Sequence, residues 1–305
     1  MFYNEVHGRG ETMHFVKAKG ILSSGGGMNF YRGCQHGCVY CDARSRCYQM
    51  NHIFEDIEVK ENAMELLDAA LKSKRRPCML GTGSMFDPYM PLEKSQQMTR
   101  QMLELAEKHG FGATVLTKSD LVLRDLDVLK RINEKSKAVV QISLTVMDER
   151  LSKILEPNVC PTSRRIEVLG KLQEAGIPTV VWLCPILPFI TDTEENILGI
   201  LQACRDTGVK GIIQYGMGLT LRDGNREYFY AALDKHFPGL KERYIRLYGN
   251  AYELPSPKND ELMALFHGFC EYYGIWHDNQ KIFTYLHELE TDACHQLSFF
   301  GGEAG

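Results

Sequence analysis

Short apolar runs alternate along the chain with stretches in which apolar residues recur every three or four positions. The apolar runs predict strands at about 28–33, 78–80, 113–116, 138–144, 179–183 and 211–215. The periodic stretches predict helices at 61–73, 91–110 and 162–175, and two more that begin at Asp120 and Asp192. This succession is the pattern of right-handed βα units on a parallel sheet.

Six such units are too few for a closed eight-stranded barrel, and they suit an α/β fold of the partial (β/α)6 TIM-barrel type. We expect this barrel to span residues 28–220. Residues 1–27 are polar and glycine-rich and predict a flexible leader, whereas residues 221–305 are rich in Tyr, Phe, His and Leu and predict a helical C-terminal cover. Functional residues of such barrels come from the carboxyl ends of the strands, so the loop after each strand is where chemistry is expected.

Composition excludes several classes of protein. A hydrophobic fraction of 44% and a charged fraction of 24% are those of an ordinary globular chain. The net charge of −4 does not favour a tight nonspecific grip on nucleic acid. We find neither an apolar run of about 18 residues nor a signal peptide, so no membrane association is expected. Ten cysteines, mostly unpaired in spacing, fit a reducing cytoplasm, where we expect the protein to reside.

The most informative stretch follows the first predicted strand, where Cys34, Cys38 and Cys41 have the spacing C-x3-C-x2-C. Three thiolates that close together can hold one metal centre and cannot all pair as disulfides. Thiolates are soft ligands that select iron–sulfur clusters, zinc or copper. Gly33 and Gly37 flank the thiolates and allow the backbone to turn tightly around a bulky centre.

The alternative is a structural zinc ion with His36 or Cys47 as the fourth ligand. In that case the protein would be a noncatalytic, zinc-stabilised nucleic-acid-binding module. Structural zinc sites usually use two separated ligand pairs, and no second pair follows this one. Small zinc modules also do not need six βα units, so the spacing favours the cluster.

The loop resembles the cluster-binding loop of the radical S-adenosylmethionine (SAM) superfamily, C-x3-C-x-aromatic-C, with Tyr40 as the aromatic residue. Further runs look like those of the spore photoproduct lyase-related family, and the similarity covers about residues 21–220. These runs are Asp87-Pro88-Tyr89-Met90-Pro91-Leu92-Glu93, Leu116-Thr117-Lys118-Ser119 and Leu155-Glu156-Pro157.

This resemblance implies a [4Fe–4S] cluster on Cys34, Cys38 and Cys41. Its fourth iron would chelate S-adenosylmethionine, and an electron would cleave that molecule to a deoxyadenosyl radical. The resemblance also implies a partner that supplies the electron, such as a flavodoxin or ferredoxin. The substrate class that it suggests is a nucleobase or a nucleic-acid lesion.

The resemblance also implies roles for residues near the strand ends. Each of these residues has an ordinary structural role as its alternative, such as a βα turn, a surface lysine or a barrel-interior serine. Gly81, Gly83 and Ser84 would contact the methionyl amino group, and Arg165 would contact the methionyl carboxylate. Lys118 would reach the ribose or the carboxylate, Ser143 would reach the ribose, and Tyr40 would pack beside the adenine. Asp87 would be a second-shell or substrate carboxylate.

The chain departs from the lyase pattern in its candidate hydrogen donor. The lyase-related family places a hydrogen-donating cysteine after the second strand, where this chain has no thiol, and a tyrosine after the last cluster cysteine, where it has Asp42. Cys184, at the end of the fifth strand, is the candidate donor in its place, followed by Cys160. Buried cysteines more often serve as small apolar side chains.

Overall fold

A five-stranded parallel sheet forms the centre of the molecule. The computed structural model describes residues 13–82 and 85–289. The sheet has the order β4-β5-β6-β7-β8, so each strand lies beside the next one in the chain. Its strands are β4 (Met79–Thr82), β5 (Gly112–Thr117), β6 (Ala138–Ser143), β7 (Thr179–Trp182) and β8 (Gly211–Ile213). Five of the six predicted strands are thereby confirmed.

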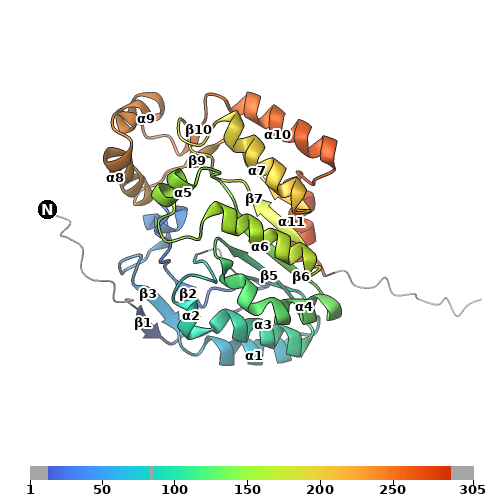
Figure 1. Ribbon diagram of the computed structural model, residues 1–305. Coiled ribbons are helices and arrows are strands. Elements are labelled where there is room, and N and C mark those ends of the chain that lie inside the picture. The colour runs from blue at the N-terminus through green and yellow to red at the C-terminus, as the bar shows by residue number, and fades with distance from the viewer. Residues whose placement is uncertain (1–12, 83–84, 290–305) are drawn as a thin grey trace, which may run out of the picture.

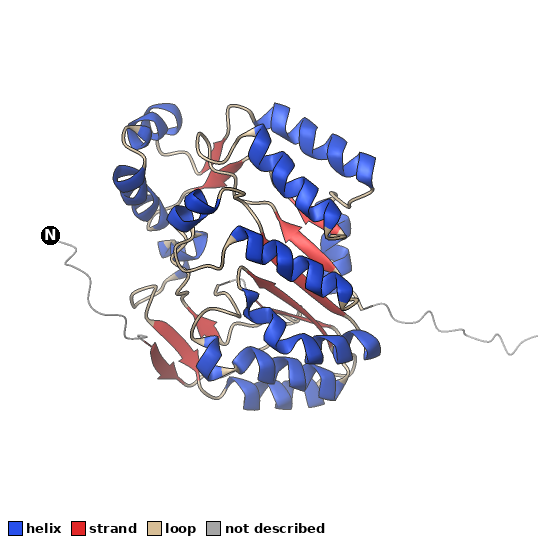
Figure 2. Ribbon diagram, in the orientation of Figure 1, coloured by secondary structure: helices blue, strands red, loops and turns tan. Residues whose placement is uncertain are grey.

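Helices cover the outer face of this sheet (Figures 1 and 2). They are α1 (Ala63–Ser73), α3 (Met98–His109), α4 (Leu126–Lys135), α6 (Thr162–Glu174) and α7 (Glu194–Asp206). Alternate strand residues such as Val115, Ile142 and Val181 are fully buried in the core that these helices share with the sheet. Shorter elements lie in the connections: η1 (Asp42–Arg44), η2 (Arg46–Tyr48), α2 (Glu93–Gln96), η3 (Asp120–Asp125) and α5 (Glu149–Leu155).

The sheet curls into a partial barrel. At one edge, the Met28 N–H donates to the Gly81 carbonyl, so the segment before the cysteine loop joins β4 through a parallel bridge at Gly27. At the other edge, Trp276 bridges to Gly211 of β8. Helix α11 (Asn279–His287) contacts both β4 and β8. The predicted partial barrel is therefore confirmed, and its curvature brings the strand ends around one interior.

A small second sheet corrects two expectations. Its order is β1-β3-β2, with β1 (Met13–Val16) parallel to β3 (Ile57–Lys60) and β2 (Tyr31–Arg32) antiparallel to it. The part of the predicted flexible leader from residue 13 onward thus includes a paired strand, and residues 1–12 lie outside the described residues. The strand predicted at 28–33 is only two residues long and pairs with β3. No local pattern indicates these pairings, because the partner strand comes later in the chain.

The C-terminal region is mainly helical, as predicted. It contains α8 (Asn225–His236), α9 (Leu240–Tyr248), α10 (Asn259–Tyr273) and α11, and Figure 1 shows α10 alongside α7. A strand that the sequence did not predict, β10 (Glu253–Pro255), pairs with β9 (Gly218–Thr220). The predicted weakly ordered tail after about residue 297 lies outside the described residues.

Two helix starts differ from the prediction by one residue. Ser119, not Asp120, caps η3 by accepting from the Leu121 N–H, and Thr193, not Asp192, caps α7. The predicted helix 91–110 is interrupted at Gln97, whose φ of 52° separates α2 from α3. Among the described helices, none combines the length and apolar character that a bilayer crossing needs.

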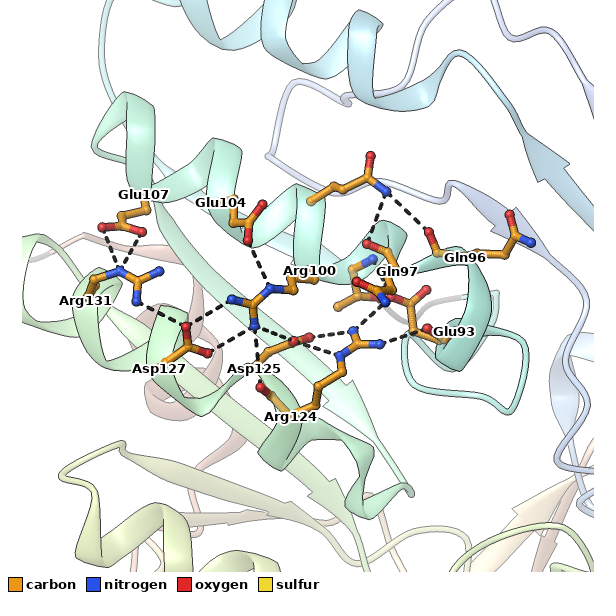
Figure 3. Close-up of polar contacts among 12 residues, drawn as sticks. Glu93, Gln96, Gln97, Arg100, Glu104, Glu107, Arg124, Asp125, Asp127 and Arg131 are labelled. Atoms are coloured by element: carbon orange, nitrogen blue, oxygen red, sulfur yellow. Dashed lines mark hydrogen bonds and ion pairs between the residues drawn. The ribbon is translucent and has the colours of Figure 1, made fainter.

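An ionic network ties α2, α3, η3 and α4 together (Figure 3). Arg100 and Arg124 both bind the fully buried carboxylate of Asp125. Arg124 also pairs with Glu93, whose other oxygen accepts from the Tyr31 hydroxyl at 2.6 Å. The network thus reaches β2, the strand that leads into the cysteine loop.

Candidate active site

The three cysteines lie in one loop between β2 and η1. Cys34 and Cys38 are buried, Cys41 is partly buried, and all three are free thiols. Burial raises the pKa of Cys34 to about 12, and negative charge on Asp87 and Cys41 adds to this effect. Burial likewise raises the pKa of Cys38 and of Cys41. The metal-free protein therefore holds thiols at neutral pH, and a bound metal would displace their protons.

Two glycines give the loop its shape. Gly33 and Gly37 have φ values of +99° and +70°, in the left-handed region that favours glycine. A Cβ on Gly33 would lie 2.5 Å from the Phe54 carbonyl oxygen, and one on Gly37 would lie 3.3 Å from Pro157 Cγ. The tight turns expected around the thiolates are therefore present.

The segment 155–158 holds the loop in place. The Val39 N–H donates to the Leu155 carbonyl at 2.9 Å, and the Asn158 N–H donates to the His36 carbonyl at 3.1 Å. The Asn158 side-chain amide donates to the Gln35 carbonyl at 2.8 Å. The Leu155-Glu156-Pro157 run thus serves as a support for the cysteine loop, a role that the sequence did not indicate.

Glu156 binds both Tyr40 of the cysteine loop and Arg165 of α6. Its carboxylate accepts from the Tyr40 hydroxyl and from Arg165 Nη2, the latter at 2.6 Å. Burial alone would raise the pKa of Glu156, but Arg165 and Lys118 outweigh it and the pKa is lowered. Arg165 is fully buried, and its Nη1 donates to the carbonyl of the buried Ser143. The structure gives Arg165 a protein carboxylate as its partner, and its expected contact to the methionyl carboxylate stays a prediction.

Asp87 joins three segments at the strand ends. One carboxylate oxygen accepts from the Tyr89 N–H and the Thr117 hydroxyl, and the other accepts from the Lys118 N–H at 2.8 Å. His36 Nε2 lies 3.0 Å from that second oxygen. Burial would raise the pKa of Asp87, but these partners outweigh it and the pKa is lowered. Asp87 thus ties the cysteine loop, through His36, to the end of β5.

Lys118 carries a positive charge next to the cysteine loop. Its Nζ lies 5.9 Å from the centre of the Tyr40 ring. Burial would lower the pKa of Lys118, but negative charge on Cys38 and Glu156 outweighs it, so the pKa is raised. Its charge also acts on Cys38, Cys41 and Cys184. Lys118 is therefore the expected site residue whose position best suits an anionic or polar cofactor group.

The predicted glycine-rich turn begins inside β4, whose last residue is Thr82. Gly81 binds Gly26 and Met28 through its backbone, and Gly83 and Ser84 lie outside the described residues. The Thr82 hydroxyl is buried and has no hydrogen-bond partner in the described part of the chain. It lines a cavity of about 270 Å³ together with Gly81 and Met28. An unpartnered buried hydroxyl at this place fits the expected contact to an ammonium group.

Cys184 follows β7 beside an aromatic pair. The Trp182 and Tyr215 ring centres are 6.3 Å apart, and the Trp182 ring N–H donates to Gln141 at 2.7 Å. Tyr215 is 64% exposed, and the Trp182 ring also packs against Phe283 of α11, with ring centres 5.9 Å apart. Burial raises the pKa of Cys184 to about 12. Cys160, the other candidate, points its thiol at the Lys118 carbonyl, 3.2 Å away.

The two expected fourth ligands of a zinc ion are engaged elsewhere. His36 contacts Asp87, and the exposed Cys47 lies 3.4 Å from Arg222 Nη1. Three sulfurs on one tetrahedral zinc lie about 3.8 Å apart. Among the described residues, these three sulfurs do not form a group whose ligand atoms all lie within 4.8 Å of one another. At least one pair of these sulfurs is thus farther apart in this structure than two ligands of one zinc ion would be.

Comparisons with known proteins agree with this geometry. Residues 28–201 match the Radical SAM superfamily. An uncharacterized protein of Methanocaldococcus jannaschii is 34% identical over 174 residues, which are 56% of this chain and 63% of that protein. The chain thus spans less than two thirds of the length of this relative. A radical SAM Nα-GlyT isomerase of Pseudomonas phage M6 is 28% identical over 183 residues, 59% of this chain and 36% of that protein.

Solved structures show a similar fold. A spore photoproduct lyase variant with bound AdoMet and dinucleoside spore photoproduct has a TM-score of 0.60 and 14% sequence identity, and the match covers 81% of this chain and 74% of that one. At this identity the likeness concerns the fold alone. Because the family match covers more than half of the sequence, the chain belongs to the radical SAM superfamily, whose members use S-adenosylmethionine and an iron–sulfur cluster.

Proposed function

We propose that the protein is a radical SAM enzyme that holds a [4Fe–4S] cluster on Cys34, Cys38 and Cys41. The observation that carries this proposal is the loop of three free thiols at the carboxyl ends of a curled parallel sheet. Its nearest alternative ligands, His36 and Cys47, are engaged with Asp87 and Arg222. Three cysteines would bind three of the four irons of such a cluster and leave the fourth iron open for S-adenosylmethionine.

The chain's own residues fit S-adenosylmethionine beside such a cluster. Lys118 offers a cation, the Thr82 hydroxyl offers an unpartnered acceptor, and Tyr40 offers a buried ring. We propose that Gly81, Gly83, Ser84 and Ser143 complete this site and that Arg165 acts through Glu156 and Tyr40. When bound, the cluster and S-adenosylmethionine supply a deoxyadenosyl radical, which removes a hydrogen atom from a substrate.

We propose a nucleobase, or a lesion in a nucleic acid, as the substrate class. Trp182 and the exposed Tyr215 form an aromatic pair at the carboxyl ends of β7 and β8, and aromatic rings stack on planar bases. The similar spore photoproduct lyase structure holds a dinucleoside, which agrees with this class. The net charge of −4 does not support tight binding to a duplex.

Cys184 is our proposed hydrogen donor to the substrate radical. Because burial raises its pKa to about 12, its sulfur keeps its hydrogen at neutral pH. In this step the S–H bond breaks, a C–H bond forms on the substrate, and the unpaired electron moves to the sulfur. Asp87, our other catalytic candidate, is proposed to act by positioning the loop through His36 and Lys118.

The reaction also requires an electron, for which we propose a flavodoxin or ferredoxin as the donor.

A substrate-free assay tests directly whether the three cysteines support cleavage of S-adenosylmethionine. Reconstituted protein mixed with dithionite and S-adenosylmethionine is expected to release deoxyadenosine, and a Cys38→Ala variant is expected to release none. Equal release from both proteins would contradict the assignment of the cysteines.

A solvent-isotope experiment tests the role of Cys184. In deuterated solvent the thiol carries deuterium, so product formed by the wild type is expected to gain deuterium at the carbon that was a radical. A Cys184→Ala variant is expected to lose this label while still releasing deoxyadenosine. A Cys160→Ala variant serves as the control, and loss of label in it alone would assign the donor to Cys160 instead.

A further inference from the structure

Two histidines and an aspartate meet at the edge of the small N-terminal sheet. His14 lies in β1, and His52 and Asp56 lie in the connection that leads into β3. One ligand atom from each lies within 4.8 Å of the others, and in the part of the chain that the structure describes this is the one such group. His14 Nδ1 lies 3.0 Å from Asp56 Oδ2, and the two imidazole centres are 4.8 Å apart.

We propose that His14, His52 and Asp56 bind a divalent transition-metal ion, with Zn²⁺ as the best fit. Imidazole nitrogens and a carboxylate oxygen are common zinc ligands, and three protein ligands with a fourth open position form a known type of zinc site. Bonds of about 2.0–2.2 Å to a tetrahedral ion place ligand atoms about 3.3–3.6 Å apart. The ligand atoms lie within 4.8 Å of one another, and one pair is 3.0 Å apart, so small side-chain movements suffice.

His52 is already oriented as a metal ligand. Its Nδ1 lies 3.0 Å from the Ile53 carbonyl oxygen, which assigns the ring hydrogen to Nδ1 and leaves the lone pair on Nε2. Metal-binding histidines usually donate their other ring N–H to a carbonyl or carboxylate in this way. The Nε2 atom is buried and has no hydrogen-bond partner among the described residues. A bound ion would satisfy this nitrogen, which otherwise carries the penalty of an unpaired buried polar group.

Glu58 lies next to this group and supplies a second carboxylate. The parallel register of β1 and β3 places His14 opposite Glu58, and Glu58 Oε2 lies 3.9 Å from His52 Nε2. Two carboxylates balance the charge of a divalent ion, and Glu58 can supply the fourth ligand or hold a water there. The side chains of His14 and Asp56 are 38% and 31% exposed, which leaves a path for the ion.

The position of the group suggests its role. The same connection contains Phe54, whose carbonyl accepts from the Cys34 N–H at 3.2 Å. An ion on His14, His52 and Asp56 would therefore fasten β1 to the segment that supports the first cluster cysteine. This role is structural and does not depend on the radical chemistry proposed above.

Cobalt substitution provides a test that separates this group from the cysteine loop. A Cys34→Ser, Cys38→Ser, Cys41→Ser variant is titrated with Co²⁺ and with Zn²⁺, and its folding is checked by circular dichroism. We expect one equivalent to bind, with visible cobalt bands but without the intense near-ultraviolet charge-transfer band of thiolate ligands. Wild-type protein with its iron in place is expected to hold the same equivalent of zinc, which covers the case in which the cysteine variant does not fold.

Substitutions in the wild-type, iron-loaded protein locate the ion. His52→Ala and Asp56→Asn are each expected to weaken zinc affinity at least about tenfold, as loss of metal-site residues does. His109→Ala is the matched control, because His109 also pairs with an aspartate, Asp68, but beside two lysines and with no second histidine. Zinc is also expected to slow proteolysis near β1 in the wild type and not in His52→Ala. Absence of zinc binding, or equal affinity in His52→Ala and the wild type, would overturn the proposal.

Discussion

At the scale of single residues, the buried pair of Glu156 and Arg165 connects the cysteine loop to the barrel. Both side chains are 0% exposed, and Glu156 also accepts from Tyr40, next to Cys41 in the chain. Removing one partner of a buried ion pair leaves an uncompensated charge, which destabilises a fold by about 3–5 kcal/mol. This pair therefore fixes the aromatic residue of the loop at the same time as it stabilises the core.

A Glu156→Gln variant is expected to lose about 3–5 kcal/mol of unfolding free energy at pH 7. The pKa of Glu156 is lowered from its ordinary 4.5, so its contribution is full above that pH and is lost as the pH falls through the folded-state pKa. The difference between wild type and variant in urea unfolding should shrink accordingly below pH 4.5. Glu167→Gln, at a carboxylate that is 59% exposed, is the control and should unfold like the wild type at every pH.

The sequence indicates the candidate metal ligands but not the residues that support their loop. Spacing alone picks out Cys34, Cys38 and Cys41, because ligands from one loop must be close in the chain. Arg165 was expected at the cofactor, and the structure pairs it with Glu156. A helix, α5, intervenes before Glu156, and no spacing rule indicates which of the charged residues around it becomes buried. Thr82 could have been found as the polar residue between Gly81 and Gly83 at the end of β4.

At the scale of elements, the cysteine loop depends on a close approach between Gly37 and Pro157. Gly37→Ala is expected to reduce the iron bound per chain, because a Cβ there would lie 3.3 Å from Pro157 Cγ in addition to the strain of a φ of +70°. Left-handed backbone at a residue with a Cβ costs about 1–2 kcal/mol. Iron analysis after reconstitution, with urea unfolding in parallel, measures both effects.

Gly110→Ala separates backbone strain from this contact. Gly110 has a nearly identical φ of +73°, but nothing lies within 4 Å of an added Cβ. The Gly110→Ala variant should lose a similar amount of unfolding free energy and bind as much iron as the wild type. Equal iron in the two variants would show that the contact with Pro157 does not shape the loop.

Element prediction succeeded where neighbours in the chain are neighbours in space. The strands β4 to β8 and their helices follow from local apolar patterns, since each βα unit packs beside the next. The β1-β3-β2 sheet was missed because β1 and β3 are about forty residues apart and each is only four residues long. The proposed metal site could not be predicted from the sequence for the same reason, because His14 lies near His52 and Asp56 only when β1 pairs with β3.

At the scale of the whole molecule, helix α11 closes the end of the barrel interior that lies away from the cysteine loop. Ile282 and Leu286 of α11 pack against Met79, Val139 and Val180, which begin or lie early in their strands. The carboxyl ends of the strands remain for chemistry. The sequence predicted a helical C-terminal region but not that its last described helix would contact both edge strands, because this depends on how far the sheet curls.

Ile282→Ala is expected to lower the unfolding free energy by about 2–5 kcal/mol, as large-to-small substitutions in a core do. Ile282 is 0% exposed, and its Cδ1 lies against Gly211 of β8. Iron content should not change, because this contact is at the opposite end of the strands from Cys34. Leu247→Ala, at a side chain that is 53% exposed, serves as the control in urea unfolding and should resemble the wild type.

The central claim is that Cys34, Cys38 and Cys41 hold a cluster with one iron open to S-adenosylmethionine. Its most direct measurement is metal analysis of anaerobically reconstituted protein, followed by electron paramagnetic resonance of the reduced protein with and without S-adenosylmethionine. We predict about four irons and four sulfides per chain, and a spectrum that changes when S-adenosylmethionine is added. A protein without iron, or a cluster spectrum that S-adenosylmethionine leaves unchanged, would contradict the account.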